Sequence, residues 1–179
     1  MNGVPCPLLY VSASQINAIA SFAVDGDTNA TVVVQYLGVS SDPVPLTATV
    51  AASGIYSQSF TGTGLGSILN LDDSVNSPSN PAARGSFVAM FAAGGGQTTT
   101  PGLDGSIYTS AGSNPQLPVG VQVGGIDAEV SYAGAAPGFV QGALQVNFRI
   151  PANAPTGDVP VILTVGNSAS QSGLTVSIR

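Results

Sequence analysis

Aspartates supply most of the side chains in this sequence that could do chemistry, and five of the eight fall in three short stretches. Asp25 and Asp27 flank a glycine in VDGDTN, Asp72 and Asp73 are adjacent in LDDSVN, and Asp104 stands in LDG. Calcium takes six to eight oxygen ligands, many of them loop carboxylates, so Asp25, Asp27, Asp72 and Asp73 are candidate calcium ligands. The Asp-x-Asp-x-Asp-Gly loop pattern is completed at none of these places, and Asp-Gly is also a hairpin-turn signal. Ordinary turns are therefore the alternative.

The other residue types in the chain exclude the common catalytic arrangements of side chains. The chain of 179 residues has no histidine and no lysine, so neither a Ser-His-Asp nor a Cys-His arrangement can form, and zinc loses its commonest ligand. Cys6, the only cysteine, stands between Pro5 and Pro7 without the cationic neighbour that activates a thiol, and we expect a structural role for it. The acids are too few for a glycosidase carboxylate pair. We therefore expect no enzyme activity, no catalytic residue and no cofactor.

Charge is sparse over the whole chain. Three arginines and nine acidic residues give a net charge of -6, and 7% of the residues are charged. Arg84, Arg149 and Arg179 are too scattered to form the basic patch that nucleic acid requires, and we expect Arg84 to anchor turn carbonyls. No run of 18 apolar residues exists, so we expect no membrane insertion.

So neutral a surface is typical of an extracellular or cell-surface protein, or of a subunit whose faces are covered in an assembly. No signal-peptide pattern opens the sequence, so an export signal would lie upstream. A Ser/Thr-rich extracellular domain without any assembly is the plainer alternative.

Short runs rich in β-branched residues alternate with glycine and proline throughout the chain, which has 23 Gly and 13 Pro. In LQVNFRI, Val146, Phe148 and Ile150 alternate with polar residues, as in a strand with one buried face. Such runs with turn signals between them predict an all-β fold of the sandwich class. The predicted strands include residues 31–37, 45–50, 85–92, 119–123, 144–150, 159–165 and 174–178.

An internal repeat divides the chain into two units. Three segments match later ones, and we therefore predict tandem β-sandwich modules of common design, the first over residues 1–51 and the second over residues 52–179. A Gly/Ser/Thr-rich stretch at about 94–116 is predicted to be a long surface loop of the second module. The matched segments are 2–10 with 124–132, 15–17 with 145–147, and 34–50 with 162–178, the last without a gap.

Individual residues become equivalent through these matches. The last match places Gly38 on Gly166, and Leu46 on Leu174. The first places Tyr10 on Tyr132, and we expect the two tyrosines to pack alike in the cores of their modules rather than to form a sugar-binding platform. The absence of tryptophan also argues against sugar binding.

The first module is predicted to lack its opening strand. Residues 117–123, LPVGVQV, precede the Gly-Gly turn of the second unit, whereas only Met1 precedes the Asn2-Gly3 turn of the first. Either the chain is a piece of a longer protein, or another copy supplies the strand by strand addition. The donor could be residues 172–179 as the most exposed segment, unless that strand belongs to its own sheet. The expected assembly residues are Leu8, Leu9, Tyr10, Val11, Leu174, Val176 and Ile178.

Residues 8–22, 68–88 and 130–151 together resemble the acidobacterial Solibacter-type uncharacterised C-terminal domain family. The resemblance spans nearly the whole chain, although residues 90–97 and Cys6 depart from the usual sequence pattern of the family. It implies immunoglobulin-like β-sandwich modules at the C-terminal ends of large exported proteins. It implies no catalytic residues, because the family has no assigned activity.

These observations lead to two functional expectations. The first is a non-enzymatic, extracellular structural or adhesive protein that self-associates into a filament or surface assembly by strand complementation. The alternative is a C-terminal accessory binding module that attaches an exported protein to a polysaccharide or to other cell-envelope components. In that alternative, residues 94–116 would carry the recognition.

Overall fold

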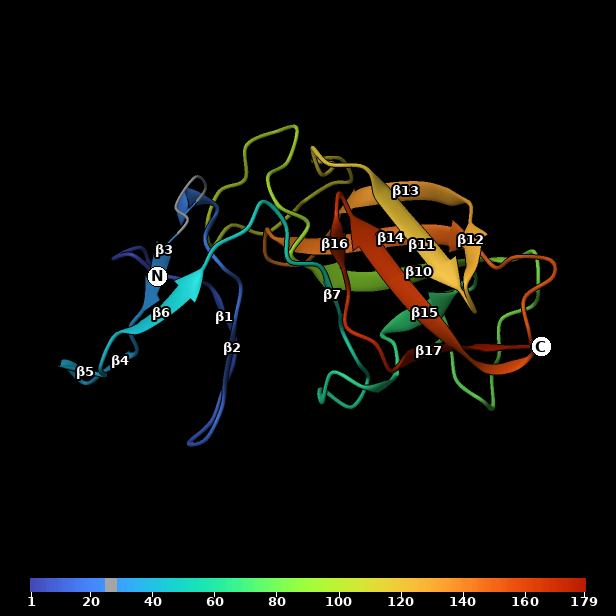
Figure 1. The fold of residues 1–179 in the computed structure, drawn as a ribbon, viewed down its shortest axis with the longest axis horizontal. Helices are drawn as coiled ribbons and strands as arrows, with labels where there is room; N and C mark the ends of the chain where they lie inside the picture. Colours follow the sequence, from blue (N-terminus) through green and yellow to red (C-terminus); the bar gives the residue numbers. More distant parts are fainter. Residues whose placement is uncertain (25–28) are drawn as a thin grey trace.

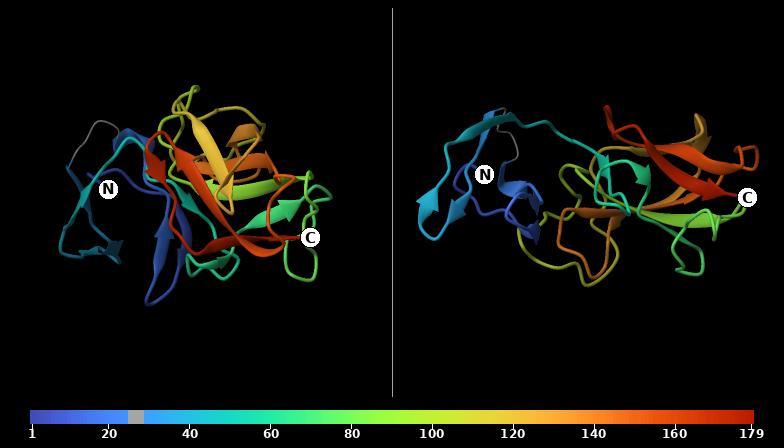
Figure 2. Two further views of the ribbon diagram at one scale, coloured as in Figure 1. Left: turned by 45° about the vertical axis from the view of Figure 1, so that its right-hand side comes forward. Right: turned by 90° about the horizontal axis from the view of Figure 1, so that it is seen from below.

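The computed structural model describes residues 1–24 and 29–179, so Asp25 and Asp27 lie outside the described residues. It contains 17 strands, and one short 3-10 turn, η1 (Phe22–Val24), is the only helical element of the described residues. The predicted all-β fold is therefore confirmed. Two groups of strands lie side by side along the long axis, β1–β6 around the N-terminus and β7–β17 around the C-terminus (Figure 1). The view from below shows the same separation (Figure 2).

The C-terminal group consists of two sheets. In the first, the strand order is β13-β14-β10-β7, with β9 also paired to β10; in the second it is β12-β11-β15-β17-β8, with β16 also paired to β15. The first sheet comprises β7 (Gly54–Ile55), β9 (Ile68–Asn70), β10 (Phe87–Ala93), β13 (Val130–Ala135) and β14 (Ala143–Arg149). The second comprises β8 (Gly64–Leu65), β11 (Val119–Val123), β12 (Ile126–Ala128), β15 (Gly157–Val165), β16 (Ser168–Ala169) and β17 (Leu174–Ile178).

One hydrophobic core fills the space between these two sheets. Alternate residues of β10, β14 and β15 are buried, because successive side chains of a strand point to opposite faces. Val146 and Phe148 from the first sheet meet Val161, Leu163 and Val165 from the second, and all five are fully buried. Burying a side chain of this size stabilises the fold by about 1.5–3 kcal/mol, so the sandwich has a substantial core.

Strand β17 belongs to this core. It pairs antiparallel with β15 and parallel with β8, and Leu174, Val176 and Ile178 are buried. The expectation that residues 172–179 form the most exposed segment is therefore wrong, because the apolar side chains of β17 fill their own sandwich. The other reading, in which the strand belongs to its own sheet, is confirmed, and these three residues leave the set of candidate assembly residues.

The stretch between β9 and β10 forms ordered turns, as the sequence predicts. Buried Asn76 takes the place of a neighbouring strand: its side-chain Nδ2 donates to the carbonyl of Ser177 at 2.9 Å, and its Oδ1 accepts from the Ser177 amide at 2.8 Å. Arg84 donates to the carbonyl of Ala154 at 2.6 Å, so it anchors a backbone carbonyl as predicted, but one between β14 and β15 rather than in the middle segment.

The N-terminal group has no comparable core. Its strands form three separate antiparallel pairs, β1-β2, β3-β6 and β4-β5. Within the described part of residues 1–50, only Ile19, Ser21 and Ala30 are buried. The strands are β1 (Leu8–Val11), β2 (Ile16–Ala18), β3 (Asn29–Val32), β4 (Gln35–Tyr36), β5 (Val39–Ser40) and β6 (Val44–Thr47).

Residues 94–116 form a long segment between β10 and β11, as predicted, but it is not simply a surface loop. Thr98 and Tyr108 are buried. The segment also reaches the N-terminal group, since the side-chain amide of Gln97 donates to the carbonyl of Phe22 at 2.9 Å. The loop therefore connects the two groups of strands.

Candidate functional site

The N-terminal group repeats the hydrogen-bonding pattern of the last strands of the sandwich, beginning with the first hairpin. In β1-β2, Leu8 pairs with Ala18, and the register then shifts by a bulge so that Tyr10 pairs with Asn17. In β13-β14, Val130 pairs with Phe148, and the same bulge brings Tyr132 opposite Asn147. The first two sequence matches are therefore reproduced residue for residue by the strand register.

The turn that precedes each hairpin is also shared. Asn2 and Gly3 have φ angles of 47° and 78°, and Gly124 and Gly125 have φ angles of 59° and 78°. The amide of Asn2 donates to the carbonyl of Thr31 at 2.9 Å, whereas the amide of Gly124 donates to that of Pro160 at 2.8 Å. The start of β3 is thus equivalent to the start of β15.

A serine repeats the same three hydrogen bonds in both units. Ser41 donates its amide to the carbonyl of Val34 at 2.8 Å, and its Oγ accepts from the Val34 amide at 3.0 Å and donates to the next carbonyl. Ser170 makes the corresponding bonds with Leu163 at 2.7 and 3.1 Å. Strands β3 and β4 together are therefore the counterpart of β15, and β5 is the counterpart of β16.

The ungapped third match is wrong along its whole length, by one residue up to Ser41 and by two residues at β6. Ala30 pairs with Leu46 in β3-β6, and its equivalent Val159 pairs with Val176 in β15-β17. Leu46 is therefore equivalent to Val176 and not to Leu174. The two tight turns likewise align Gly38 with Asn167 rather than with Gly166. The segments before β3 and before β6 each differ by one residue in length from their counterparts, which the ungapped sequence match concealed.

These equivalences account for residues 1–50 as the second half of a sandwich. The described residues of this range contain counterparts of β13 to β17 and of the turn before β12, but none of β7 to β11. More than one opening strand is therefore lacking. In the second unit, β10 lies beside β14 and β11 lies beside β15, so the corresponding places beside β2 and beside residues 32–36 have no strand among the described residues.

The backbone of residues 32–36, which we call the acceptor edge, is the counterpart of the part of β15 that pairs with β11. Val34 directs its amide and carbonyl to Ser41. Neighbouring residues of a strand point these groups to opposite sides, so Val33 and Gln35 direct theirs away from β5. In the second unit, the equivalent residues Ile162 and Thr164 face β11.

The apolar face beside the acceptor edge is exposed, where its counterpart is fully buried. Val34 and Tyr36 are 43% and 75% exposed, whereas the equivalent Leu163 and Val165 are 0% exposed. On β2, Ile16 is 41% exposed and its equivalent Val146 is 0% exposed. The N-terminal group therefore exposes apolar side chains whose equivalents form a core.

The four N-terminal assembly residues, Leu8, Leu9, Tyr10 and Val11, are all about half exposed. For Tyr10 this contradicts the expected core position. Its equivalent Tyr132 is half-buried, donates its hydroxyl to the carbonyl of Ala135 at 2.7 Å and accepts from the amide of Gly112. The two tyrosines share a register but not an environment, because the segment that covers Tyr132 has no counterpart around Tyr10.

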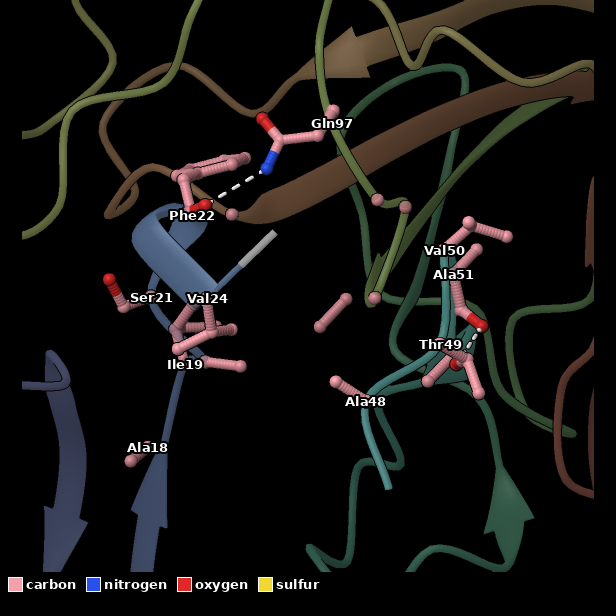
Figure 3. Close-up of a pocket in the computed structure, with 17 residues that line it drawn as sticks. Ala18, Ile19, Ser21, Phe22, Val24, Ala48, Thr49, Val50, Ala51 and Gln97 are labelled. Atoms are coloured by element: carbon pink, nitrogen blue, oxygen red, sulfur yellow. Dashed lines mark hydrogen bonds between the residues drawn. The ribbon is translucent and has the colours of Figure 1, made fainter. Parts of the chain in front are cut away.

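A pocket of about 440 Å³ lies where the half-sandwich meets the complete one. Figure 3 shows Ala18, Ile19 and Phe22 on one side of it and Ala48 and Val50 on the other. Its remaining lining comes from residues 93–97 and from Gly142. By the strand register, Ala18 stands where the second unit has Phe148, so smaller side chains leave space at the end of the incomplete interior.

The candidate calcium ligands that the structure describes are engaged in a turn. Asp72 accepts hydrogen bonds from the amide and the hydroxyl of Ser74, which lower the pKa of its carboxyl below the ordinary value. Asp73 adopts a left-handed conformation with φ of 63°. No group of three or more His, Cys, Asp or Glu side chains gathers within residues 1–24 and 29–179, and the turn interpretation explains both residues.

Asp104 and Cys6 each contact residues near the N-terminus. Asp104 accepts from the Ser21 hydroxyl and, at 2.7 Å, from the amide of Phe22 at the start of η1. Cys6 is half-buried, and the N-terminal amino group of Met1 lies 3.8 Å from its Sγ. The expectation that Cys6 has no cationic neighbour is therefore wrong, because the Asn2-Gly3 turn folds the chain end back onto it.

Comparison of the chain with protein-family models, curated proteins and solved structures gave no match. The resemblance to the Solibacter-type family and the immunoglobulin-like character of the modules therefore stay predictions. In the described part of the chain, no helix is long and apolar enough to cross a membrane. The fold and the site define an all-β protein in which a packed two-sheet sandwich is preceded by strand pairs that repeat the pairing of its last strands.

The sequence matches pointed to the N-terminal unit but not to the residues of its acceptor edge. Val33, Val34, Tyr36 and Ile16 were absent from the expected assembly set. No sequence signal marked them, because the position of β15 beside β11 is known only from the structure. Applying the pairing of β11 with β15 to the first unit identifies residues 33–36 as a strand edge that has no partner among the described residues.

Proposed function

We propose that this chain is a non-enzymatic structural or adhesive protein of the cell exterior, which associates with neighbouring copies by strand complementation. The observation that carries the proposal is the acceptor edge: residues 32–36 have the hydrogen-bonding geometry of β15, while the place of β11 beside them is open among the described residues. Unpaired strand edges are the usual starting points of strand addition.

Two physical terms favour complementation. A strand in the place of β11 would satisfy the backbone groups of Val33 and Gln35, and unsatisfied groups of this kind are unfavourable once they are removed from water. It would also cover Val34 and Tyr36, whose equivalents are fully buried. Because donor and acceptor are different surfaces, repeated association of this kind gives a ring or an open filament.

The extracellular part of the proposal rests on composition. With 7% charged residues, the surface lacks the mixed charges that keep crowded proteins apart, as fits a protein whose faces are covered by its neighbours. The alternative, a binding module for polysaccharide or envelope components, was to use residues 94–116. Part of that segment already contacts Phe22 through Gln97, which leaves less of it free for a ligand.

A pair of matched lysine variants tests the proposal. Tyr36 and Leu71 are 75% and 74% exposed, so Tyr36→Lys and Leu71→Lys add the same charge at equally exposed positions, one beside the acceptor edge and one on the complete sandwich. Light scattering and negative-stain electron microscopy should show regular assemblies for the natural chain and for Leu71→Lys, and monomers for Tyr36→Lys. A monomeric natural chain, or assembly of both variants, would overturn the proposal.

A further inference from the structure

In the N-terminal unit, the position that corresponds to β11 lies between two neighbouring segments. In the second unit, β11 pairs with β15 on one side and with β12 on the other. The counterpart of β12 is residues 4–6, which follow the Asn2-Gly3 turn as β12 follows the Gly124-Gly125 turn. Residues 4–6 and the acceptor edge therefore flank one strand position, which we call the acceptor slot.

The closed end of the acceptor slot is already formed. The amino group of Met1 donates to the carbonyl of Val4 at 2.7 Å, and the amide of Val4 donates to the carbonyl of Met1 at 2.8 Å. These two bonds make Met1 and Val4 the end pair of a two-residue hairpin, as Val123 and Ile126 are in β11-β12. Met1 thus occupies the end position of the strand in the slot, as Val123 does in β11.

The two prolines next to Cys6 are compatible with this position. Residues at Val4 and Cys6 direct their backbone groups toward the slot, and the intervening residues direct theirs away, because the direction alternates along a strand. Pro5 and Pro7, which lack an amide hydrogen, therefore remove no donor from the slot. The slot keeps the amide of Cys6 on one side and those of Val33 and Gln35 on the other.

We infer that the acceptor slot selects an extended polypeptide strand of the β11 type, uncharged and with apolar side chains at alternate positions, which runs antiparallel to residues 32–36. The occupant is specified within the chain itself: β11 is VGVQV, with Val121 and Val123 buried and Gln122 exposed. This inference rests on the proposed function, and it adds which strand sequence the site accepts and in which direction and register.

Side-chain order decides the fit. A strand whose apolar residues fall opposite Val32, Val34 and Tyr36 covers the exposed apolar face, whereas a slip of one residue points the same side chains to water. A charged side chain facing this interior would be unfavourable, because the strand in the slot would remove it from water. Among the described residues of the range 1–50, the charged side chain is that of Asp42, which lies between β5 and β6.

The test uses the full chain with a hexapeptide added before Met1. The extension Leu-Pro-Val-Gly-Val-Gln reproduces residues 117–122 and leaves Met1 in the position of Val123. The control extension Leu-Pro-Gly-Val-Gln-Val has the same composition with the two faces exchanged. Hydrogen exchange of backbone amides, followed by NMR, is the measurement, and the amides of the β15 residues serve as the internal reference for folding.

The first extension should slow exchange of the Cys6, Val33 and Gln35 amides about tenfold or more relative to the natural chain. The Val34 amide, which already donates to Ser41, should change little. The control extension should protect none of them. Equal protection by both extensions, or protection by neither while the β15 amides stay protected, would overturn the inference.

A second arm separates this inference from the proposed function. The free peptide LPVGVQV should protect the same amides of the natural chain at high concentration, and it should dissolve assemblies if neighbours use the slot. Protection of Val33 and Gln35 in a chain that never assembles would sustain the strand selectivity and reject self-association. Assembly without any protection by the peptide or the extension would reject the strand selectivity and leave self-association standing.

Discussion

At the scale of single residues, the two units make the same hydrogen bonds in different surroundings. Ser170 is buried and Ser41 is exposed, yet each binds the amide and the carbonyl of one strand residue. A hydrogen bond contributes little where water can replace it, and its loss is unfavourable where the remaining group stays buried. The difference in exposure between Ser41 and Ser170 therefore indicates that the first unit is less covered than the second.

We expect Ser170→Ala to lower the free energy of unfolding by about 1–3 kcal/mol, because the Leu163 amide is left without an acceptor in a buried strand. Ser41→Ala should change it by less than about 0.5 kcal/mol, as for other exposed positions. Urea denaturation of both variants measures the difference. Equal losses would contradict the exposed position of Ser41.

At the scale of elements, glycines allow the connection after β6 to cross the end of β10 at close range. Gly94 has a φ of 75°, and a Cβ on it would lie 1.9 Å from the carbonyl oxygen of Ala52. Gly96, with a φ of 71°, meets the carbonyl of Val50 in the same way. The amide of Ala52 donates to the carbonyl of Gly94 at 3.0 Å, so this crossing fixes where the half-sandwich joins the complete one.

Gly105 provides the matched control for this crossing, because its φ is 77° and no atom lies within 4 Å of a Cβ built on it. Gly105→Ala should destabilise the protein by about 1 kcal/mol through backbone strain alone. Gly94→Ala adds a backbone collision, and we expect a loss of about 2–4 kcal/mol. Thermal and urea unfolding compare the two, and equal losses would contradict a close crossing.

At the scale of the whole molecule, a few contacts hold the open half-sandwich against the complete sandwich. The carboxylate of Asp104 binds the Ser21 hydroxyl and the Phe22 amide, and Gln97 binds the Phe22 carbonyl. Ile19 lies against Gly142, where a Cβ would approach within 2.5 Å of its side chain. These contacts position the acceptor slot relative to the sandwich.

Asp104→Ala should loosen this junction without unfolding the sandwich. Small-angle X-ray scattering should give a larger radius of gyration, and limited proteolysis should remove residues 1–50 faster than in the natural chain. Asp42→Ala, which removes the same charge from an exposed position before β6, is the control and should behave like the natural chain. If Asp104→Ala also matches the natural chain, Asp104 does not hold the two parts together.

The fold class and the repeat can be read from the amino-acid sequence without coordinates. Alternation in segments such as Val146, Phe148 and Ile150 depends only on the two-residue period of a strand, so it is visible without coordinates. The equivalences of residues 2–10 and 15–17 were recognised as well, because their turn and strand residues are local. The chemistry of Asp72 as a turn residue was likewise readable from its neighbours.

Only the tertiary structure decided which side chains are covered. Tyr10 and Tyr132, or Val34 and Leu163, occupy equivalent places in matched strands but differ in exposure, because burial depends on strands distant in sequence. The placement of β17 inside its sandwich and the two-residue correction at Leu46 have the same origin, since register is set by pairing across the sheet. Local pattern specifies a strand, and the presence or absence of its neighbours specifies what that strand can bind.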